Sequence, residues 1–325
     1  MDRSSTLLSL TLSLIVFTVG ASGQLARNIP PPRADHHQHV FSPDVAKLQG
    51  VTTITARDVI ADLDAAGIER AVLLSTAYAW GRPGREPQNE YEMVKATNDW
   101  VGEQAALYPK RLVGFCGFNP LKDYAVAEIE RCSRIPALLR GIKFHVGNSD
   151  VQMENPRHLE KLKAVFRAAN AKRMSMVIHM RASFSLNRPY GAEQARAFIE
   201  HLLPLAPDIT IQIAHLGSSG PGYDDPKVDA FMDALVAGVQ DPQVKNRRNV
   251  WFDLTTIVHP TNTPERSAVV WRRIRQIGPD RILYGSDAPF GSNQRPKDAW
   301  AEIAKLGLTE KELRSIAGNR APYMR

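Results

Sequence analysis

The sequence is poor in cysteine. Only two cysteines occur among its 325 residues, and they do not form a C-x-x-C pair. A thioredoxin-type redox motif and a zinc site built on such a pair are therefore excluded. The chain also lacks a basic stripe with interleaved aromatic residues, although its net charge is +7. We therefore expect no nucleic-acid partner. The excess positive charge indicates a solvated surface or a preference for anionic substrates.

The first residues have the pattern of a secretory signal peptide, which we place at residues 1–23. Arg3 gives a basic start, residues 7–19 are an apolar run, and residues 21–23 are small. The apolar run is too short to span a bilayer as a helix, which needs about 20 residues. An uncleaved anchor is the alternative. We expect a mature chain from Gln24 that is secreted or periplasmic and makes no membrane contact.

The two cysteines fall in segments that read as core elements. Cys116 lies in the strand-like run 113–118, and Cys132 lies on the helix expected after it. Export would permit a disulfide between them. We nevertheless expect two buried free thiols.

After a polar lead-in over residues 24–33, strand and helix patterns alternate without a break. The strand-like runs are rich in β-branched and aromatic residues, and the helical segments repeat apolar residues every three or four positions. The predicted strands are 34–40, 70–76, 111–118, 140–145, 174–180, 209–215, 249–255 and 281–287. The predicted helices are 57–66, 89–107, 123–134, 156–172, 191–203, 226–238, 264–276, 296–305 and 309–317.

Eight strands alternating with eight helices predict an α/β fold, a single-domain (β/α)8 TIM barrel over residues 34–325. An open doubly wound sheet is the alternative, but its first strand is typically followed by a glycine-rich turn. Here the first strand ends in histidines instead. Asn155, Asp225 and Thr263 each precede a proline, and this pairing is typical of a helix start.

The first predicted strand ends in the sequence Asp35-His36-His37-Gln38-His39. Alternate side chains of a strand share a face, so Asp35, His37 and His39 are expected on one side. Two imidazoles in this arrangement can bind one metal ion. Solvated histidines at a polar strand end are the alternative.

Four further polar residues close later strands at regular intervals. Lys143, His179 and His215 are 36 residues apart, and Asp287 follows after twice that interval. A single histidine at such a place is more often a hydrogen-bonded core residue, and a carboxylate there is costly unless it is paired or coordinated. Taken together, the imidazoles and the carboxylate suit Zn²⁺, with Mn²⁺, iron or cobalt as alternatives.

These residues resemble the motifs of the amidohydrolase superfamily, in its amidohydrolase-related branch. The similarity covers residues 34–325. It consists of D-x-H-x-H at 35–39, G-x-K-x-H at 141–145, a strand ending in His179, A-H-L-G at 214–217 and G-S-D-A-P at 285–289. Asn319 matches the closing signature of the branch only loosely.

The resemblance implies a role for each matching residue. His37, His39, His179 and Asp287 would bind the metal, and Asp287 would also accept a proton from the nucleophilic water. His215 would orient that water and polarise the substrate, or bind a second ion. A bound divalent ion lowers the pKa of water from 15.7 to about 7, and a nearby carboxylate can move the proton.

Lys143 and His145 leave alternatives open. In some superfamily members a lysine at this position is carbamylated and bridges two metals, whereas others keep a plain lysine beside one metal. An ion pair between Lys143 and Asp287 is a further reading. Some lactonases of the branch use no metal. His145 shares the face of Lys143 and could contact the substrate.

Two loops carry candidate substrate-binding residues. The loop after the second strand holds Tyr78, Trp80, Arg82 and Arg85, and the loop after the fifth holds Arg181 and Arg188. Among these, Trp80, Arg181 and Arg188 are the expected contacts, because arginine binds carboxylates in bidentate fashion. Solvated loop arginines are the alternative.

We therefore expect a metal-dependent hydrolase that attacks a C–O or C–N bond of a small, acidic lactone, ester or amide with metal-bound hydroxide. The first alternative is a metal-dependent non-oxidative decarboxylase of the same branch. The second is a barrel that binds a ligand without turnover. The expected partner is a small-molecule substrate, and self-association into a homo-oligomer is left open because no interface residue is evident.

Overall fold

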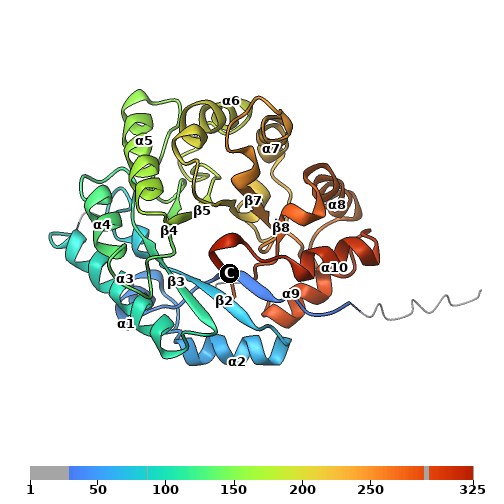
Figure 1. Ribbon diagram of the computed structural model, residues 1–325, viewed down its shortest axis with the longest axis horizontal. Coiled ribbons are helices and arrows are strands. Elements are labelled where there is room, and N and C mark those ends of the chain that lie inside the picture. Colours follow the sequence, from blue (N-terminus) through green and yellow to red (C-terminus); the bar gives the residue numbers. More distant parts are fainter. Residues whose placement is uncertain (1–28, 86, 289–292, 325) are drawn as a thin grey trace, which may run out of the picture.

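Eight parallel strands form one sheet, and each strand pairs with the next along the chain (Figure 1). The computed structural model describes residues 29–85, 87–288 and 293–324. The predicted signal peptide and the first part of the lead-in lie outside these residues. The strands are β1 (Ala34–Gln38), β2 (Arg70–Leu74), β3 (Leu112–Gly117), β4 (Gly141–His145), β5 (Ser175–His179), β6 (Ile211–Ile213), β7 (Val250–Asp253) and β8 (Ile282–Leu283).

Backbone hydrogen bonds join the two ends of this sheet. The His36 N–H donates to the Tyr284 carbonyl at 2.9 Å, and the Asp287 N–H donates to the His37 carbonyl at 2.7 Å. The predicted (β/α)8 barrel is therefore confirmed.

The helices form an outer ring around the strands (Figure 1). They are α1 (Pro43–Gln49), α2 (Ala56–Ala66), α3 (Glu90–Leu107), α4 (Ala125–Cys132), α5 (Pro156–Ala171), α6 (Ala192–Ala197), α7 (Pro226–Gln240), α8 (Pro264–Ile277), α9 (Pro296–Ile303) and α10 (Glu310–Gly318). In the part of the chain that the structure describes, none of the helices has the length and apolarity needed to cross a membrane.

The predicted helix starts are confirmed by their capping bonds. The side chains of Asn155, Asp225 and Thr263 each accept a backbone N–H from the first turn of α5, α7 and α8. Two local differences appear. Helix α1 was not predicted, and α6 continues as a π-helical turn over Phe198–Leu202.

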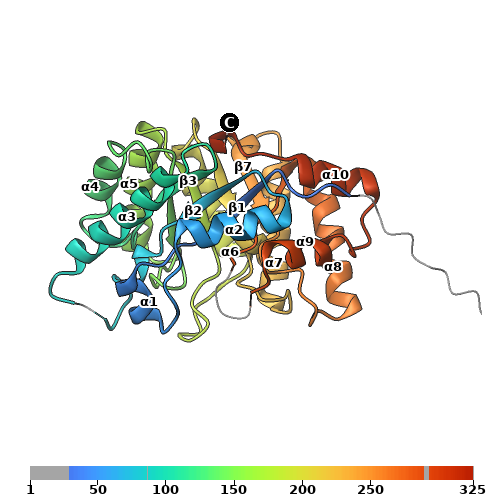
Figure 2. The ribbon, with the colours of Figure 1, turned by 90° about the horizontal axis from the view of Figure 1, so that it is seen from below.

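The C-terminal end closes one end of the barrel. Tyr323 packs edge-on against Phe115 inside the barrel, and the Arg70 side chain donates to the Met324 carbonyl. Because Arg70 opens β2, this is the end at which the strands begin. Figure 2 shows the C-terminus there and α1 at the opposite end, so the carboxyl ends of the strands remain available for a site.

The expectation of two free thiols was wrong. Cys116 and Cys132 form a disulfide, with their Cα atoms 6.3 Å apart. Cys116 lies near the end of β3, and the chain folds back so that the last turn of α4 packs over it. The crossover from strand to helix therefore brings together two residues that are 16 positions apart.

Candidate metal centre and substrate cavity

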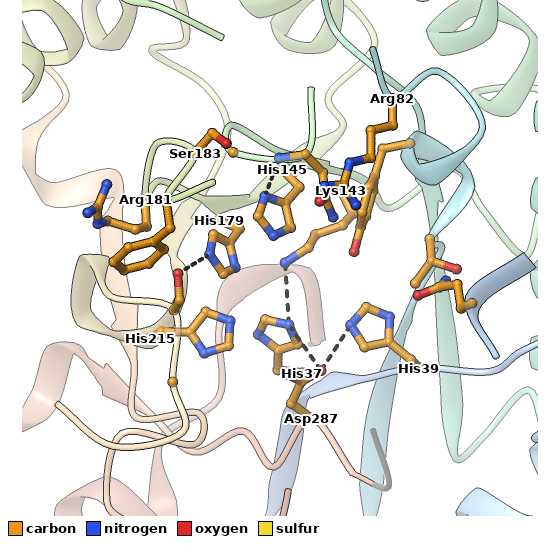
Figure 3. A pocket seen from close by; sticks show the side chains of 18 of the residues that line it. His37, His39, Arg82, Lys143, His145, His179, Arg181, Ser183, His215 and Asp287 are labelled. Carbon is orange, nitrogen blue, oxygen red and sulfur yellow. Dashed lines mark hydrogen bonds and ion pairs between the residues drawn. The ribbon is translucent and has the colours of Figure 1, made fainter. Parts of the chain in front are cut away.

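A cavity of about 440 Å³ opens at the carboxyl ends of the strands. This volume lies within the roughly 300–1,000 Å³ of small-molecule sites. The residues predicted from strand ends gather in it: His37, His39, Lys143, His145, His179, His215 and Asp287 all line its wall (Figure 3).

Three imidazoles have one ring nitrogen fixed by an oxygen acceptor. The His37 Nδ1 lies 3.2 Å from Asp253 Oδ2, the His39 Nδ1 lies 2.6 Å from the Leu74 carbonyl, and the His215 Nδ1 lies 2.9 Å from the Thr255 carbonyl. Since these oxygens can only accept, each Nδ1 carries the proton. A neutral ring held in this way presents a lone pair at Nε2.

His215 and Asp287 both sit in left-handed turns directly after their strands. Their φ angles are +55°, and Leu216 follows at +45°. Positive φ is uncommon for residues other than glycine and concentrates at functional sites. Strands β6 and β8 are shorter than predicted and end before these residues. His215 belongs to a 3₁₀ turn over Ala214–Gly217, and Asp287 lies beyond the end of β8.

Gly285 allows β1 and β8 to approach each other at this point. A Cβ atom at Gly285 would lie 2.3 Å from the Thr255 hydroxyl and 2.7 Å from the His37 Cβ. Only glycine fits without displacing one of these neighbours. The glycine of the G-S-D sequence is therefore a packing requirement for the position of His37.

The donor atoms converge in a way that calls for a cation. Ligand atoms of His37, His215 and Asp287 lie within 4.8 Å of one another, and the His39 Nε2 is 3.1 Å from Asp287 Oδ1. Nitrogen lone pairs facing a carboxylate repel unless a proton or a metal ion lies between them. Three imidazole nitrogens and one carboxylate oxygen form a donor set typical of zinc.

The surroundings of His37, His215 and Asp287 favour neutral imidazoles and an ionised carboxylate, which suit a metal. Burial and the charge of Lys143 lower the pKa of His37 to about 3, and burial also lowers the pKa of His215. Burial by itself would raise the pKa of Asp287. The close contact with His39 and the nearby His37 outweigh it and hold the Asp287 pKa well below its usual range.

Lys143 lies at the base of the cavity. Its Nζ is 3.3 Å from the His37 Nε2, and only 1 % of the residue is exposed. Burial lowers the pKa of Lys143 to about 8, against the opposing charges of Asp287 and Asp253. Its position suits either reading left open above, a plain amine beside one metal or a carbamylated bridge.

Asp253 was not identified from the sequence. It ends β7 fully buried, where its carboxylate accepts hydrogen bonds from the Gln212 amide at 2.6 Å, the His215 N–H at 2.7 Å and the Thr255 N–H at 3.1 Å, besides the bond from His37. Burial favours its neutral form, but the hydrogen bond from His37 holds its pKa well below the usual range. Asp253 therefore orients two of the imidazoles. Its place at the end of a predicted strand was the available signal.

His179 and His145 form a second layer of the cavity wall. Their rings stack with centroids 3.7 Å apart, and the His179 ring lies 4.7 Å from that of His215. The His179 Nε2 is 3.1 Å from the Ser219 hydroxyl, and the His145 Nδ1 accepts the Asn148 N–H. His179 is not among the atoms that converge within 4.8 Å. Its expected role as a ligand stays a prediction.

Asp35 does not line the cavity. Its carboxylate accepts hydrogen bonds from the Gln38 amide and from the Ser286 hydroxyl at 2.9 and 2.6 Å. The register between β1 and β2 shifts between Asp35 and Gln38, which breaks the simple alternation expected for this strand. Burial raises the Asp35 pKa to about 7, against the bonds from Ser286. Asp35 therefore joins β1 to the segment after β8.

The expected substrate contacts are only partly present in this cavity. Trp80 and Arg188 are not among the described lining residues. The Trp80 indole donates to the Thr97 hydroxyl at 2.9 Å, and Arg188 forms a bidentate pair with Asp150. Arg181 and His145 do line the cavity, and so does Arg82 (Figure 3).

Several solved structures share this fold. A 5-carboxyvanillate decarboxylase from Sphingomonas paucimobilis is 18% identical, with a TM-score of 0.60 over 89% of this chain and 97% of that chain. A manganese-bound 5-carboxyvanillate decarboxylase from Novosphingobium aromaticivorans is 16% identical, with a TM-score of 0.60 over 89% and 94%. A protein described as a probable 2-pyrone-4,6-dicarboxylic acid hydrolase from Acinetobacter baumannii, with citric acid bound, is 17% identical, with a TM-score of 0.56 over 87% and 95%.

No curated protein sequence matches the chain. The model of the amidohydrolase family (Amidohydro_2), however, matches residues 34–321. That range contains the whole described barrel from β1 to α10 and every residue of the candidate metal centre. The chain therefore belongs to the amidohydrolase family.

Proposed function

We propose that the protein hydrolyses a C–O or C–N bond in a small carboxylic acid, with one divalent metal ion bound by His37, His39, His179 and Asp287. The convergence of imidazole lone pairs on a carboxylate carries this proposal. The ion would lower the pKa of a water molecule to about 7 and polarise the substrate. Zn²⁺ is proposed first because of the nitrogen-rich donor set, and Mn²⁺ second.

The residues of the chain can perform the proton transfers that hydrolysis needs. Asp287 is ionised, and its carboxylate can take the proton of the attacking water and pass it to the leaving oxygen or nitrogen. The Nε2 lone pair of His215 can accept a hydrogen bond from that water, because its Nδ1–H is bound to the Thr255 carbonyl at 2.9 Å. Ligand atoms of His215 and Asp287 lie within 4.8 Å of each other, which supports a joint role of the two groups.

Non-oxidative decarboxylation is the second candidate. It is supported by the decarboxylases among the proteins with this fold, whose names, like that of the dicarboxylic acid hydrolase, refer to carboxylic acids. The same residues would serve. A bound carboxylate would be lost as CO₂, and the carbon would take up a proton that Asp287 had first accepted from a water molecule. The two reactions differ in the fate of water.

The first experiment measures metal content and water incorporation together. Elemental analysis of the mature protein should give about one ion per chain, and a His37→Ala/His39→Ala variant should lose it. The loaded protein is then screened with lactones, esters and amides of carboxylic acids in H₂¹⁸O. Hydrolysis places ¹⁸O in the product. Release of CO₂ with no ¹⁸O in the organic product would indicate decarboxylation instead of hydrolysis. Folded protein that binds no metal would overturn the metal mechanism.

We also propose that the protein is exported, with a signal peptide at residues 1–23. The Cys116–Cys132 disulfide supports this, because disulfides persist in oxidising compartments. Mass spectrometry of protein from the periplasm or medium should find a chain that starts at Gln24 and contains no free thiol. Full-length protein in the cytosolic fraction would contradict the proposal.

A further inference from the structure

The cavity contains more positive charge than its own acids can balance. Among the described residues that line it, Arg82, Lys143 and Arg181 are basic, and Asp287 is the only carboxylate. Asp287 already faces two imidazoles, at 3.1 and 3.8 Å. An anionic substrate would complete this balance. The existing hydrogen bonds and ion pairs of these three basic residues decide which of them is free to bind the substrate.

Arg181 is occupied. Its Nε donates to Asp225 at 2.6 Å and its Nη1 donates to the Ala182 carbonyl at 2.9 Å. The guanidinium also packs over the rings of Phe184 and Tyr190, at 3.8 and 4.7 Å from their centroids. Only 2 % of the residue is exposed. Arg181 therefore stabilises the loop after β5, and Asp225 neutralises its charge, so Arg181 is not free to bind a substrate.

Lys143 is at the wrong end of the cavity to hold a distant substrate group. Its Nζ is 3.3 Å from the His37 Nε2, so it lies among the residues that would bind the metal. A group that contacted Lys143 would be at the reacting end of the substrate. An anchor for the rest of the molecule must lie elsewhere.

Arg82 has the properties of such an anchor. It is exposed in the loop between β2 and α3 and lines the cavity. Within residues 29–85, 87–288 and 293–324, no acceptor binds its guanidinium. Figure 3 shows Arg82 above Lys143 and His145, across the cavity from Arg181. The loop is itself held in place, since the Arg85 guanidinium donates to the Ala79 carbonyl at 3.1 Å.

We propose that Arg82 sets the specificity of the cavity by binding a carboxylate of the substrate that is remote from the reacting bond. This proposal rests on the proposed function, and it defines the substrate as bifunctional. One group reacts beside Asp287 and His215, and a separate carboxylate pairs with Arg82. A guanidinium can hold a carboxylate by two parallel hydrogen bonds, which fixes orientation as well as charge.

Equilibrium binding of two probes tests this without turnover. Isophthalate offers a second carboxylate for Arg82, and benzoate does not. Both are titrated by calorimetry into manganese-loaded wild-type protein and into Arg82→Gln, Arg82→Lys and Arg57→Gln variants. Arg57→Gln is the matched control, because it removes the same charge from an exposed side chain of α2 that does not line the cavity.

We expect wild-type protein to bind isophthalate at least about tenfold more tightly than benzoate. Arg82→Gln should weaken isophthalate binding about 10- to 100-fold, as for the loss of a charge-assisted hydrogen bond, and change benzoate binding less than about threefold. Arg82→Lys should recover part of the loss, and Arg57→Gln should match wild type. Equal losses in Arg82→Gln and Arg57→Gln, unchanged isophthalate binding in Arg82→Gln, or no binding by wild type would overturn the proposal.

The outcome is separable from that of the proposed function. If Arg82→Gln selectively loses isophthalate but no substrate takes up ¹⁸O, the anchor stands and hydrolysis falls. If neutral lactones or esters are hydrolysed and Arg82→Gln binds both acids like wild type, hydrolysis stands and the anchor falls.

Discussion

Replacing Asp253 by asparagine should weaken metal binding indirectly, through its effect on His37. The carboxylate accepts four hydrogen bonds: two backbone N–H groups at Oδ1 and the Gln212 amide and His37 Nδ1 at Oδ2. An asparagine can keep its oxygen towards the backbone pair only by turning its NH₂ towards Gln212 and His37. Donors then face donors. His37 is driven to carry its proton on Nε2, where the lone pair for the metal should be.

The size of the effect follows from that change of tautomer. Losing the group that orients a metal-binding histidine weakens metal affinity by about 10- to 100-fold, which is about 1.4 to 2.8 kcal/mol at 1.4 kcal/mol per tenfold. The metal-free protein should also lose on the order of 1–3 kcal/mol of stability, because a buried donor is left without an acceptor.

A competition titration with a chromophoric chelator measures the metal dissociation constant of the Asp253→Asn variant. Circular dichroism confirms that the variant is folded. Asp123→Asn is the control, since Asp123 is a surface carboxylate paired with Lys161, and it should bind metal like wild type. An Asp253→Asn protein that is folded and binds metal with unchanged affinity would refute the reasoning about the His37 tautomer.

Three further perturbations test the packing, the charge and the crosslink. Gly285→Ala should cost about 1–3 kcal/mol of stability and weaken metal binding, because the new Cβ would lie 2.7 Å from that of His37, whereas Gly318→Ala has open space and should do neither; equal metal affinity in both variants would contradict this. Burial lowers the Lys143 pKa from 10.5 to about 8, so metal-free wild type should lose stability as pH falls through that window. At pH 7, Lys143→Met should then be more stable than wild type by on the order of 3 kcal/mol, and above pH 10.5 the two proteins should be equally stable. Denaturant titrations of the metal-free proteins that give the same stability difference at both pH values would exclude a charged buried lysine. Replacing both cysteines by alanine opens a crosslink over 16 residues and should cost about 3 kcal/mol; an unchanged unfolding midpoint would show that the crosslink adds no stability.

Most of the candidate site could be predicted from the residues at the ends of the predicted strands. The carboxyl ends of parallel barrel strands meet at one face, so apolar runs ending in His179 or leading into His215 and Asp287 were sufficient to predict a shared site. The sequence did not reveal the turns. Both His215 and Asp287 lie beyond their strands at positive φ, and a propensity argument places such residues within the strand because it detects only the preceding apolar run.

Partners distant in sequence were the part that could not be predicted. The Asp253–His37 contact spans 216 residues, and the ion pairs of Arg181 with Asp225 and of Arg188 with Asp150 span 44 and 38. An arginine in a loop reads as a substrate contact until its acid is located, and the acid comes from a different loop. The disulfide was missed for the same reason, because spacing in the sequence says little about how a helix folds back over its strand.

The geometry of the metal centre is coupled to closure of the barrel. The Asp287 N–H donates to the His37 carbonyl at 2.7 Å, so one bond both joins the segment after β8 to β1 and fixes two residues of the candidate metal centre relative to each other. Asp35 reinforces this seam through Ser286, and Gly285 permits its close approach. A metal bound by His37, His39 and Asp287 therefore crosslinks the first and last strands. A metal that binds the closed barrel and not the unfolded chain stabilises the barrel in proportion to the logarithm of the metal concentration over the dissociation constant. The residues of the proposed metal site would therefore also hold together the first and last strands.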